Sequence, residues 1–330
     1  MRDRVMAACA AAVLAAAAVL AIATSAHAQT YPSKPIRIVV PFAAGGPADI
    51  TARTLGPRLT ELLGPPIIVD NRGGANGVIG AENAIRSPPD GYTMLLSTSS
   101  ITAINMVTYG DKPPYDTLRD LQPLTPVMFT TSLIVLHPSM PVKTLKELVA
   151  LAKSRPSQIT FGSAGTGGTL HFGIEMLQRD AGVKITHVPF KGAGPAVTDL
   201  IGGQINGMFV DLPVISPYVK AGKVKALAVT SVERSRYFPD IPTTKEAGYA
   251  GVEMTNCYGL LVPAKTPREI VMKLHDAVVK AVATPAVRER FMNVGADPST
   301  MSPEEFTRFI KTDIEKWGKL AKAAGIVIER

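Results

Sequence analysis

Short runs of β-branched and aliphatic residues alternate with amphipathic segments along most of the chain, and this alternation limits the folds that the chain can adopt. Several of the runs are apolar throughout, which is typical of strands that helices cover on both faces. The alternation therefore predicts an α/β protein. The predicted strands are residues 36–42, 67–70, 92–97, 133–137, 159–163, 183–190, 206–211, 224–230 and 258–262.

The length and composition of the chain limit the domain organisations that it can have. A length of 330 residues with 46% hydrophobic residues is sufficient to bury a core, and it excludes a disordered, collagenous or multi-span membrane protein. Two lobes of ordinary domain size are expected at this length. The Pro-rich segment 112–126 is the best candidate for a connection between them. No fixed-period repeat or heptad run follows residue 28, which excludes solenoids and coiled coils.

Hydroxyl residues mark the predicted helix starts. Thr144 and Glu147 form a capping-box pattern ahead of an apolar run. Three further helices are predicted where a Ser or Thr cap precedes a proline at the first helical position. These pairs are Thr266-Pro267, Thr284-Pro285 and Ser302-Pro303.

The first 28 residues have the pattern of a secretory signal. Arg2 and Arg4 precede an apolar run over residues 5–23, and a small-residue Ala-His-Ala site ends at Ala28. A retained membrane anchor is the alternative, since the run is nearly long enough to span a bilayer. Cleavage after Ala28 leaves Cys257 as the only thiol, so an internal disulfide is excluded even in an oxidising compartment.

A glycine-rich turn follows the first predicted strand and opens a helix at Pro47. The first-turn amides of a helix lack intrahelical partners, and the helix dipole adds partial positive charge. The turn can therefore hold a carboxylate or phosphate without Lys or Arg. A tight turn with no ligand, capped by its own Asp49, is the alternative. The candidate binding residues here are Phe42, Ala43, Ala44, Gly45, Gly46, Ala48 and Asp49.

A second turn of this kind follows the strand at 159–163, and a third, weaker one begins at Lys191. Glycine allows backbone donors to approach a ligand closely, and hydroxyl groups add further donors. Because ligands of open α/β sheets lie beyond the carboxyl ends of strands, all three turns are candidate sites. His171 is expected to be a packed or capping residue more often than a ligand contact. The candidate residues are Ser163, Ala164, Gly165, Thr166, Gly167, Gly168, Thr169, His171 and Lys191.

Signals for catalysis and cofactors are poor. The glycine turns match neither a dinucleotide fingerprint nor a phosphate-binding P-loop, and the stretch around Ser163 misses the nucleophile-elbow pattern. The histidines after residue 28 lie at unrelated spacings without a cysteine cluster, so no metal site or cofactor is expected. The charge of +8 favours anionic partners, but without a basic aromatic stripe no nucleic-acid partner is expected.

Six collinear segments of the chain form a recognisable pattern. They are YPSKPIRIVVPFAAGGPAD from Tyr31, VDNRGGANGVIGAE from Val69, PDGYTMLLS from Pro89, THVPFKGAGPAVTDLIGGQI from Thr186, KALAVTS from Lys225 and PDIPTTKEAGY from Pro239. These segments resemble the Bug family, the extracytoplasmic solute receptors of tripartite tricarboxylate transporters, and the resemblance extends from about Tyr31 to the carboxyl terminus.

This resemblance implies a type II periplasmic-binding-protein fold, in which two α/β lobes close on a small ligand. The implied division is a signal peptide at 1–28, lobe 1 at 29–127 and 251–330, and lobe 2 at 128–250. The family analogy also implies that the two main glycine turns grip a carboxylate. It further implies a periplasmic location, a small organic acid as ligand and integral-membrane transporter subunits as partners, and a monomer is expected.

Some positions depart from the family pattern. Val210 stands where family members often carry Asp, and Asp211 follows it. Leu170 replaces a frequent small polar residue, and Cys257 replaces an aromatic one. Because these side chains could select the variable part of a ligand, Asp211 joins the candidate binding residues, and the particular acid cannot be carried over from the family.

Three functions are compatible with the sequence. The first is a non-enzymatic receptor that hands a small carboxylate to a permease. The second is a secreted enzyme that acts on such an acid. The third is a receptor that presents its ligand to a sensor. The absence of a recognisable nucleophile, base and orienting residue favours the receptor over the enzyme.

Overall fold

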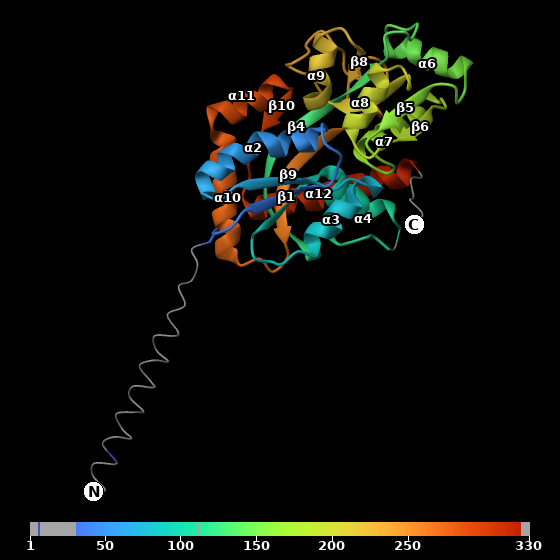
Figure 1. The fold of residues 1–330 in the computed structure, drawn as a ribbon. Coiled ribbons are helices and arrows are strands. Elements are labelled where there is room, and N and C mark those ends of the chain that lie inside the picture. Colours follow the sequence, from blue (N-terminus) through green and yellow to red (C-terminus); the bar gives the residue numbers. More distant parts are fainter. Residues whose placement is uncertain (1–5, 7–30, 111, 325–330) are drawn as a thin grey trace. The chain divides into compact units, whose positions relative to one another are not determined.

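The apolar runs of the sequence form the strands of a mixed sheet with helices packed around it (Figure 1). The structure is a computed structural model that describes residue 6, residues 31–110 and residues 112–324. The predicted signal peptide lies almost entirely outside these residues. Within them, no helix combines the length and the apolar composition needed to cross a membrane.

Each predicted run coincides with a strand, mostly to within three residues at either end. The large difference is β4, which begins far ahead of the predicted 133–137, and β10 was not predicted. The strands are β1 (Ile36–Val40), β2 (Ile67–Asn71), β3 (Thr93–Thr98), β4 (Leu121–Leu136), β5 (Thr160–Ser163), β6 (Thr186–Pro189), β7 (Gly207–Asp211), β8 (Lys225–Val229), β9 (Thr255–Pro263) and β10 (Ala296–Pro298).

The strands are arranged as two parallel groups joined by antiparallel strands, in the order β2-β1-β3-β9-β4-β7-β5-β6. In the first group β1 pairs in parallel with both β2 and β3, and in the second group β5 pairs in parallel with β6 and β7. Strand β9 is antiparallel to both β3 and β4, while β8 and β10 each add to β4. The carboxyl ends of β1 and β5 lead into the two glycine turns.

Strand β4 belongs to both groups. Its 16 residues pair with β9 as far as Thr131, and from Ser132 onward they pair with β7 and β8. The predicted connection at 112–126 therefore enters the sheet, since its end forms the first part of β4. Prolines 123 and 126 each stand beside a shift in the β9 register, which accommodates residues that cannot donate a ladder hydrogen bond.

Three of the four marked helices start at the predicted residue, namely Leu145, Pro285 and Pro303, and the fourth starts at Arg268, one residue after the predicted Pro267. Thr144 and Ser302 accept hydrogen bonds from the backbone amides of Glu147 and Glu305, as capping residues do. The predicted hydroxyl caps at Thr266 and Thr284 are wrong, because both hydroxyls donate instead to backbone carbonyls three residues earlier in the chain.

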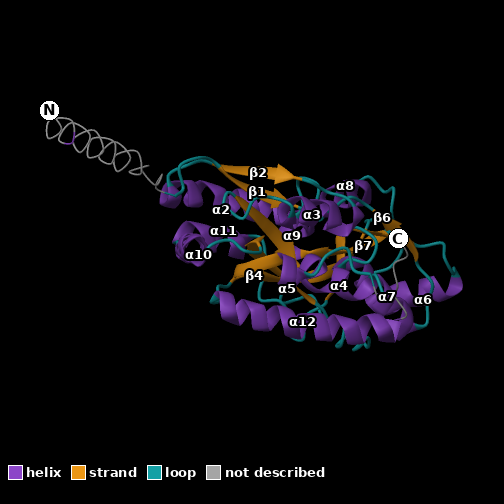
Figure 2. Cartoon of the chain, turned by 90° about the horizontal axis from the view of Figure 1, so that it is seen from below, coloured by secondary structure: helices purple, strands orange, loops and turns teal. Residues whose placement is uncertain are grey.

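The longer helices cover both sides of the sheet, and Figure 2 shows α12 running along one side. The α-helices are α2 (Pro47–Leu63), α3 (Val78–Ile85), α4 (Asn105–Thr108), α5 (Thr117–Asp120), α6 (Leu145–Ser154), α7 (Thr169–Ala181), α8 (Ala193–Ile201), α9 (Leu212–Lys220), α10 (Arg268–Ala283), α11 (Pro285–Asn293) and α12 (Pro303–Ala324). A short 3-10 turn, η1 (Ala75–Gly77), and a π-helical turn, η2 (Ser100–Ile104), complete them.

Helix α12 packs the end of the described chain against the second strand group. Trp317, the only tryptophan, is fully buried, and its ring meets that of Phe172 on α7 edge to face at 5.4 Å. Aromatic pairs in this geometry add stabilisation beyond the burial of their area.

We predict that Trp317→Ala lowers the free energy of unfolding by about 3–5 kcal/mol, because it leaves a large cavity against Phe172. Urea denaturation followed by far-UV circular dichroism measures this, since the variant has no tryptophan fluorescence. The matched control is Lys319→Ala on the exposed side of α12, which should change stability by less than about 0.5 kcal/mol. Equal unfolding midpoints for the two variants would contradict the packing role of Trp317.

Candidate functional site

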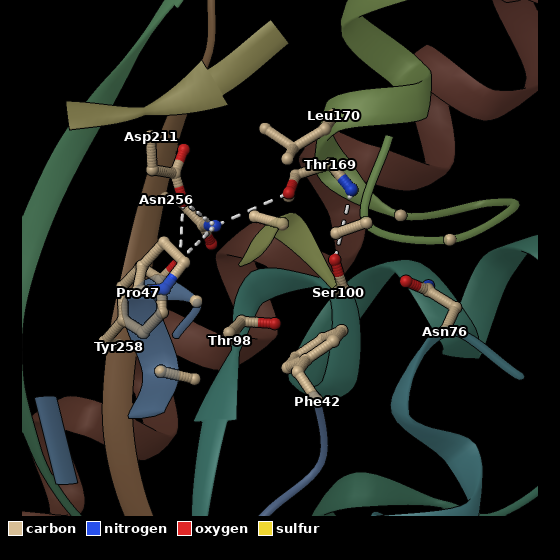
Figure 3. A pocket seen from close by; sticks show the side chains of 16 residues that line it. Phe42, Pro47, Asn76, Thr98, Ser100, Thr169, Leu170, Asp211, Asn256 and Tyr258 are labelled. Carbon is tan, nitrogen blue, oxygen red and sulfur yellow. Dashed lines mark hydrogen bonds between the residues drawn. The ribbon is translucent and has the colours of Figure 1, made fainter. Parts of the chain in front are cut away.

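The N-termini of α2 and α7 face one small cavity of about 30 Å³ (Figure 3). The two helices come from different strand groups, and each follows a glycine turn at the carboxyl end of a parallel strand. The cavity is lined by Phe42, Gly46, Pro47, Ala48, Asn76, Thr98, Ser100, Ala164, Gly165, Gly168, Thr169, Leu170, Ala193, Asp211, Asn256 and Tyr258.

Gly46 and Gly168 are equivalent N-caps of the two helices. Their φ and ψ angles are −83° and 171° for Gly46, and −87° and 172° for Gly168. These are extended values open to any residue, so the need for glycine must come from the surroundings. A Cβ atom at Gly168 would lie 2.4 Å from the amide oxygen of Asn76, whereas one at Gly46 would have room. The second turn therefore requires glycine in order to approach η1.

Asp49 holds the first turn in place. Its carboxylate accepts a hydrogen bond from the Gly45 amide at 3.0 Å and pairs with Arg53 one helical turn later, also at 3.0 Å. Burial works to raise the pKa of this carboxyl, but the hydrogen bonds from Arg53 and Gly45 outweigh it and lower the pKa below its usual value. The charge of Asp49 is therefore engaged within the turn and is neutralised there.

Two stacked imidazoles hold the second turn. The rings of His171 and His187 lie 3.9 Å apart between centroids and are nearly parallel. His171 Nδ1 accepts from the Gly167 amide at 3.0 Å, and His187 Nε2 lies 2.6 Å from the Ser163 hydroxyl. Ser163 also donates to the Gly165 carbonyl and accepts from its amide. These contacts set the shape of the turn from behind the cavity.

The cavity offers backbone donors without a side-chain cation. Among the described residues that line it, none is Lys, Arg or His. The amides of Ala48 and Leu170 lie in the first turns of α2 and α7, where a helix leaves its amides without internal partners. The Thr169 amide donates to the Ser100 hydroxyl at 3.1 Å and so links α7 to η2. Two helix dipoles thus converge on one small space.

The buried carboxylate of Asp211 closes one side of the cavity. One oxygen accepts from the Ser132 hydroxyl at 2.5 Å, and the other accepts from the Tyr258 hydroxyl at 2.5 Å and the Asn256 amide at 2.9 Å. Burial raises the pKa of Asp211 against the lowering effect of these hydrogen bonds. The Ser99 amide donates to the Asn256 side-chain oxygen, which fixes the orientation of the Asn256 amide.

Two buried polar atoms on the cavity wall have no partner among the described residues. They are the side-chain oxygen of Asn76 and the hydroxyl of Thr98, and both residues are at most 5% exposed. Buried polar atoms are nearly always hydrogen-bonded in folded proteins. Unpaired atoms that line a cavity indicate that a ligand or water completes them.

The sequence-predicted site residues fall into three groups. Phe42, Gly46, Ala48, Ala164, Gly165, Gly168, Thr169 and Asp211 line the cavity. Thr166 and the exposed Lys191 lie instead on a neighbouring groove, which shares Asn76, Ala164 and Gly165 with the cavity. Ala43, Ala44, Gly45, Asp49, Ser163, Gly167 and His171 shape the turns without lining the cavity.

Sequence reasoning missed several lining residues, and some of them had a detectable signal. Thr98 is the last residue of β3, which neighbours β1, and Ser100 lies just beyond it, so the rule that ligands lie beyond strand ends applied to them too. Asn256 and Tyr258 lie within the antiparallel strand β9, and no sequence motif marks them. Within the described residues, no group of His, Cys, Asp or Glu is arranged to hold a metal ion.

Comparisons with known proteins bear on the fold and the family of the chain. Residues 51–326 match the family model described as tripartite tricarboxylate transporter family receptor. The protein BugT of Bordetella pertussis is 35% identical over 304 residues, which cover 92% of this chain and 93% of BugT. A solved structure described as a periplasmic transporter is 40% identical, with a TM-score of 0.87 over 90% of this chain and 99% of its own. A Rhodopseudomonas palustris protein, Rpa4515, solved with adipate, is 33% identical with a TM-score of 0.86, over 90% and 99% of the two chains. The predicted two-lobed periplasmic-binding-protein fold is thereby confirmed.

We predict that His187 makes the stability of the protein depend on pH. Burial, together with the neighbouring His171, lowers the pKa of His187 to about 4 from its usual 6.5, so the unfolded chain binds the extra proton between these values. The free energy of unfolding should therefore fall as the pH drops from about 6.5 to about 4. Urea denaturation at several pH values should show this loss in the wild type and a smaller one in His187→Gln. Identical pH profiles would contradict the assignment.

Proposed function

The chain belongs to the family of tripartite tricarboxylate transporter receptors, and on this premise we propose that it captures a small carboxylate in the periplasm and delivers it to a membrane transporter of that type. The observation that carries the proposal is the convergence of the α2 and α7 N-termini on a cavity without a lining cation. Two dipoles and their free amides favour one anionic group at that point. The adipate bound by the relative from R. palustris supports a carboxylate as that group.

The proposed capture involves two lobes, at 29–127 with 251–330 and at 128–250, that close around the ligand. Contacts between the turns support a closed arrangement. The Ala43 amide donates to the Lys191 carbonyl at 3.0 Å, and a Cβ at Gly194 would lie 2.6 Å from the Ala44 carbonyl oxygen. Strand β4 passes from the first strand group to the second, so small changes within it can act as the hinge.

The free energy of ligand binding requires donors from both glycine turns at once. A charge-assisted hydrogen bond contributes about 1.5–3 kcal/mol, so four of them approach the roughly 8 kcal/mol of micromolar binding only if ordering costs are small. A cavity that excludes water strengthens each bond. One turn alone offers too few donors, and this favours capture by closure over binding to an open lobe.

The pair Ser163–His187 is the feature closest to a catalytic arrangement, but its geometry favours a structural role. The Ser163 hydroxyl is fully buried, does not line the cavity and already bonds to the Gly165 backbone. A nucleophile must reach the substrate, so this pair does not support the secreted-enzyme alternative.

A sensor role differs from transport in its cellular effect. Deletion of the gene should abolish uptake of the captured acid if the protein feeds a transporter, and it should leave uptake intact if the protein does not.

We predict that Gly168→Ala weakens binding of the captured acid by at least about tenfold, because the added methyl group meets the Asn76 side chain and holds the second turn away. A thermal-shift screen over small organic acids identifies the acid, and titration calorimetry then measures its affinity. Gly56→Ala is the matched control, since a methyl group there has room inside α2 and binding should be unchanged. Wild-type affinity in Gly168→Ala, with binding lost in Lys191→Ala, would contradict a grip by backbone donors.

A further inference from the structure

We propose that the cavity selects carboxylates that carry a hydroxyl or ammonium group, and that it disfavours acids whose second polar group is another ionised carboxylate. This inference rests on the proposed function, because it assumes that one carboxylate lies at the N-termini of α2 and α7. It concerns the rest of the ligand, which faces the side chains on the remaining walls of the cavity.

The side-chain oxygen of Asn76 is a hydrogen-bond acceptor. A chain of hydrogen-bonded side chains determines its orientation. The Tyr115 hydroxyl donates to the Ile101 carbonyl at 2.9 Å and accepts from the Asn105 amide at 3.1 Å. The Asn105 oxygen is therefore the group that accepts from the Asn76 amide, at 3.0 Å. This leaves the Asn76 oxygen as an unpaired acceptor, and Figure 3 shows the Asn76 side chain directed toward the region of Ser100. A ligand satisfies it only with a donor.

The acceptor oxygens of Asp211 give the same preference. Asp211 is the one charged side chain among the described residues that line the cavity, and it is 1% exposed. The Ser132, Asn256 and Tyr258 donors all point at its oxygens, which is the arrangement of an accepting carboxylate. A second ligand carboxylate would bring another acceptor against these oxygens, and the repulsion between the two groups would be strong in a space of low dielectric with no side-chain cation on the cavity wall. A hydroxyl or ammonium group would instead be attracted.

Thr98 provides a further partner for such a group. Its hydroxyl is buried without a partner and can accept from or donate to a ligand hydroxyl. The lining side chains of Phe42, Pro47 and Leu170 are apolar and suit a hydrocarbon stem. The cavity therefore matches a short acid with one anionic end, an apolar stem and one donor group.

The test is a calorimetric panel of acids of three to six carbons, each in four versions: unsubstituted, hydroxylated, aminated and dicarboxylic. At four carbons these are butanoate, 3-hydroxybutanoate, 3-aminobutanoate and succinate. At the best chain length, the hydroxylated or aminated acid should bind at least about tenfold more tightly than the unsubstituted acid and the plain dicarboxylate, because each of these leaves the buried acceptors unpaired. The comparison of the hydroxylated and aminated acids identifies which donor the cavity takes.

Two variants assign the selection to residues. Thr98→Val should reduce the preference for the donor-bearing acid without lowering the melting temperature of the free protein, because the hydroxyl has no partner there. Thr102→Val is the control: its hydroxyl bonds to the Thr98 carbonyl at 3.2 Å and does not line the cavity, so it should lower stability and leave the preference intact. Asp211→Asn should reduce the disadvantage of the dicarboxylate by about tenfold.

The outcomes separate this inference from the proposed function. Unsubstituted or dicarboxylic acids that bind as tightly as the donor-bearing ones would overturn the inference and leave carboxylate capture standing. Preferences unchanged in both Thr98→Val and Asp211→Asn would also overturn it. Binding of no acid in the panel would contradict the inference and the proposed function together.

Discussion

The buried carboxylate of Asp211 is the interaction on which the arrangement of the site depends. It binds Ser132, where β4 passes from one strand group to the other, and it binds Asn256 and Tyr258 on the antiparallel strand β9. A buried charge is tolerated only when donors surround it, so the strands that supply the donors must meet at this point. The same meeting point brings the two glycine turns, which belong to different strand groups, to one cavity.

Recognition of an anion without cations follows from this geometry. A lysine beside the ligand would also attract the carboxylates of Asp211 and Asp49, whereas helix N-termini act at short range and in a defined direction. Asp49 is neutralised by Arg53 within the first turn, and the exposed Lys191 lies on the neighbouring groove. The positive potential that the anion meets is therefore that of the α2 and α7 backbones, and the side chains around it are free to select the rest of the molecule.

The sequence predicted local features well and long-range ones poorly. The glycine turns were identifiable because strand, glycines and helix follow one another within about a dozen residues, and the strand runs needed only their apolar pattern. The first half of β4 was missed because Pro123 and Pro126 argue against a strand, and only pairing with β9 overrides them. The hydrogen-bond partners of Asp211 could not be predicted from the sequence. Ser132 and Asn256 lie 79 and 45 residues from Asp211 and meet it only because their strands cross.

The most direct test of this account is a crystal structure of the protein with the tightest-binding acid. We predict that the two oxygens of the ligand carboxylate lie within about 2.7–3.2 Å of backbone nitrogens in the first turns of both α2 and α7, with no Lys or Arg side chain in contact. A carboxylate paired with Lys191, or one held by the N-terminus of a single helix, would contradict it.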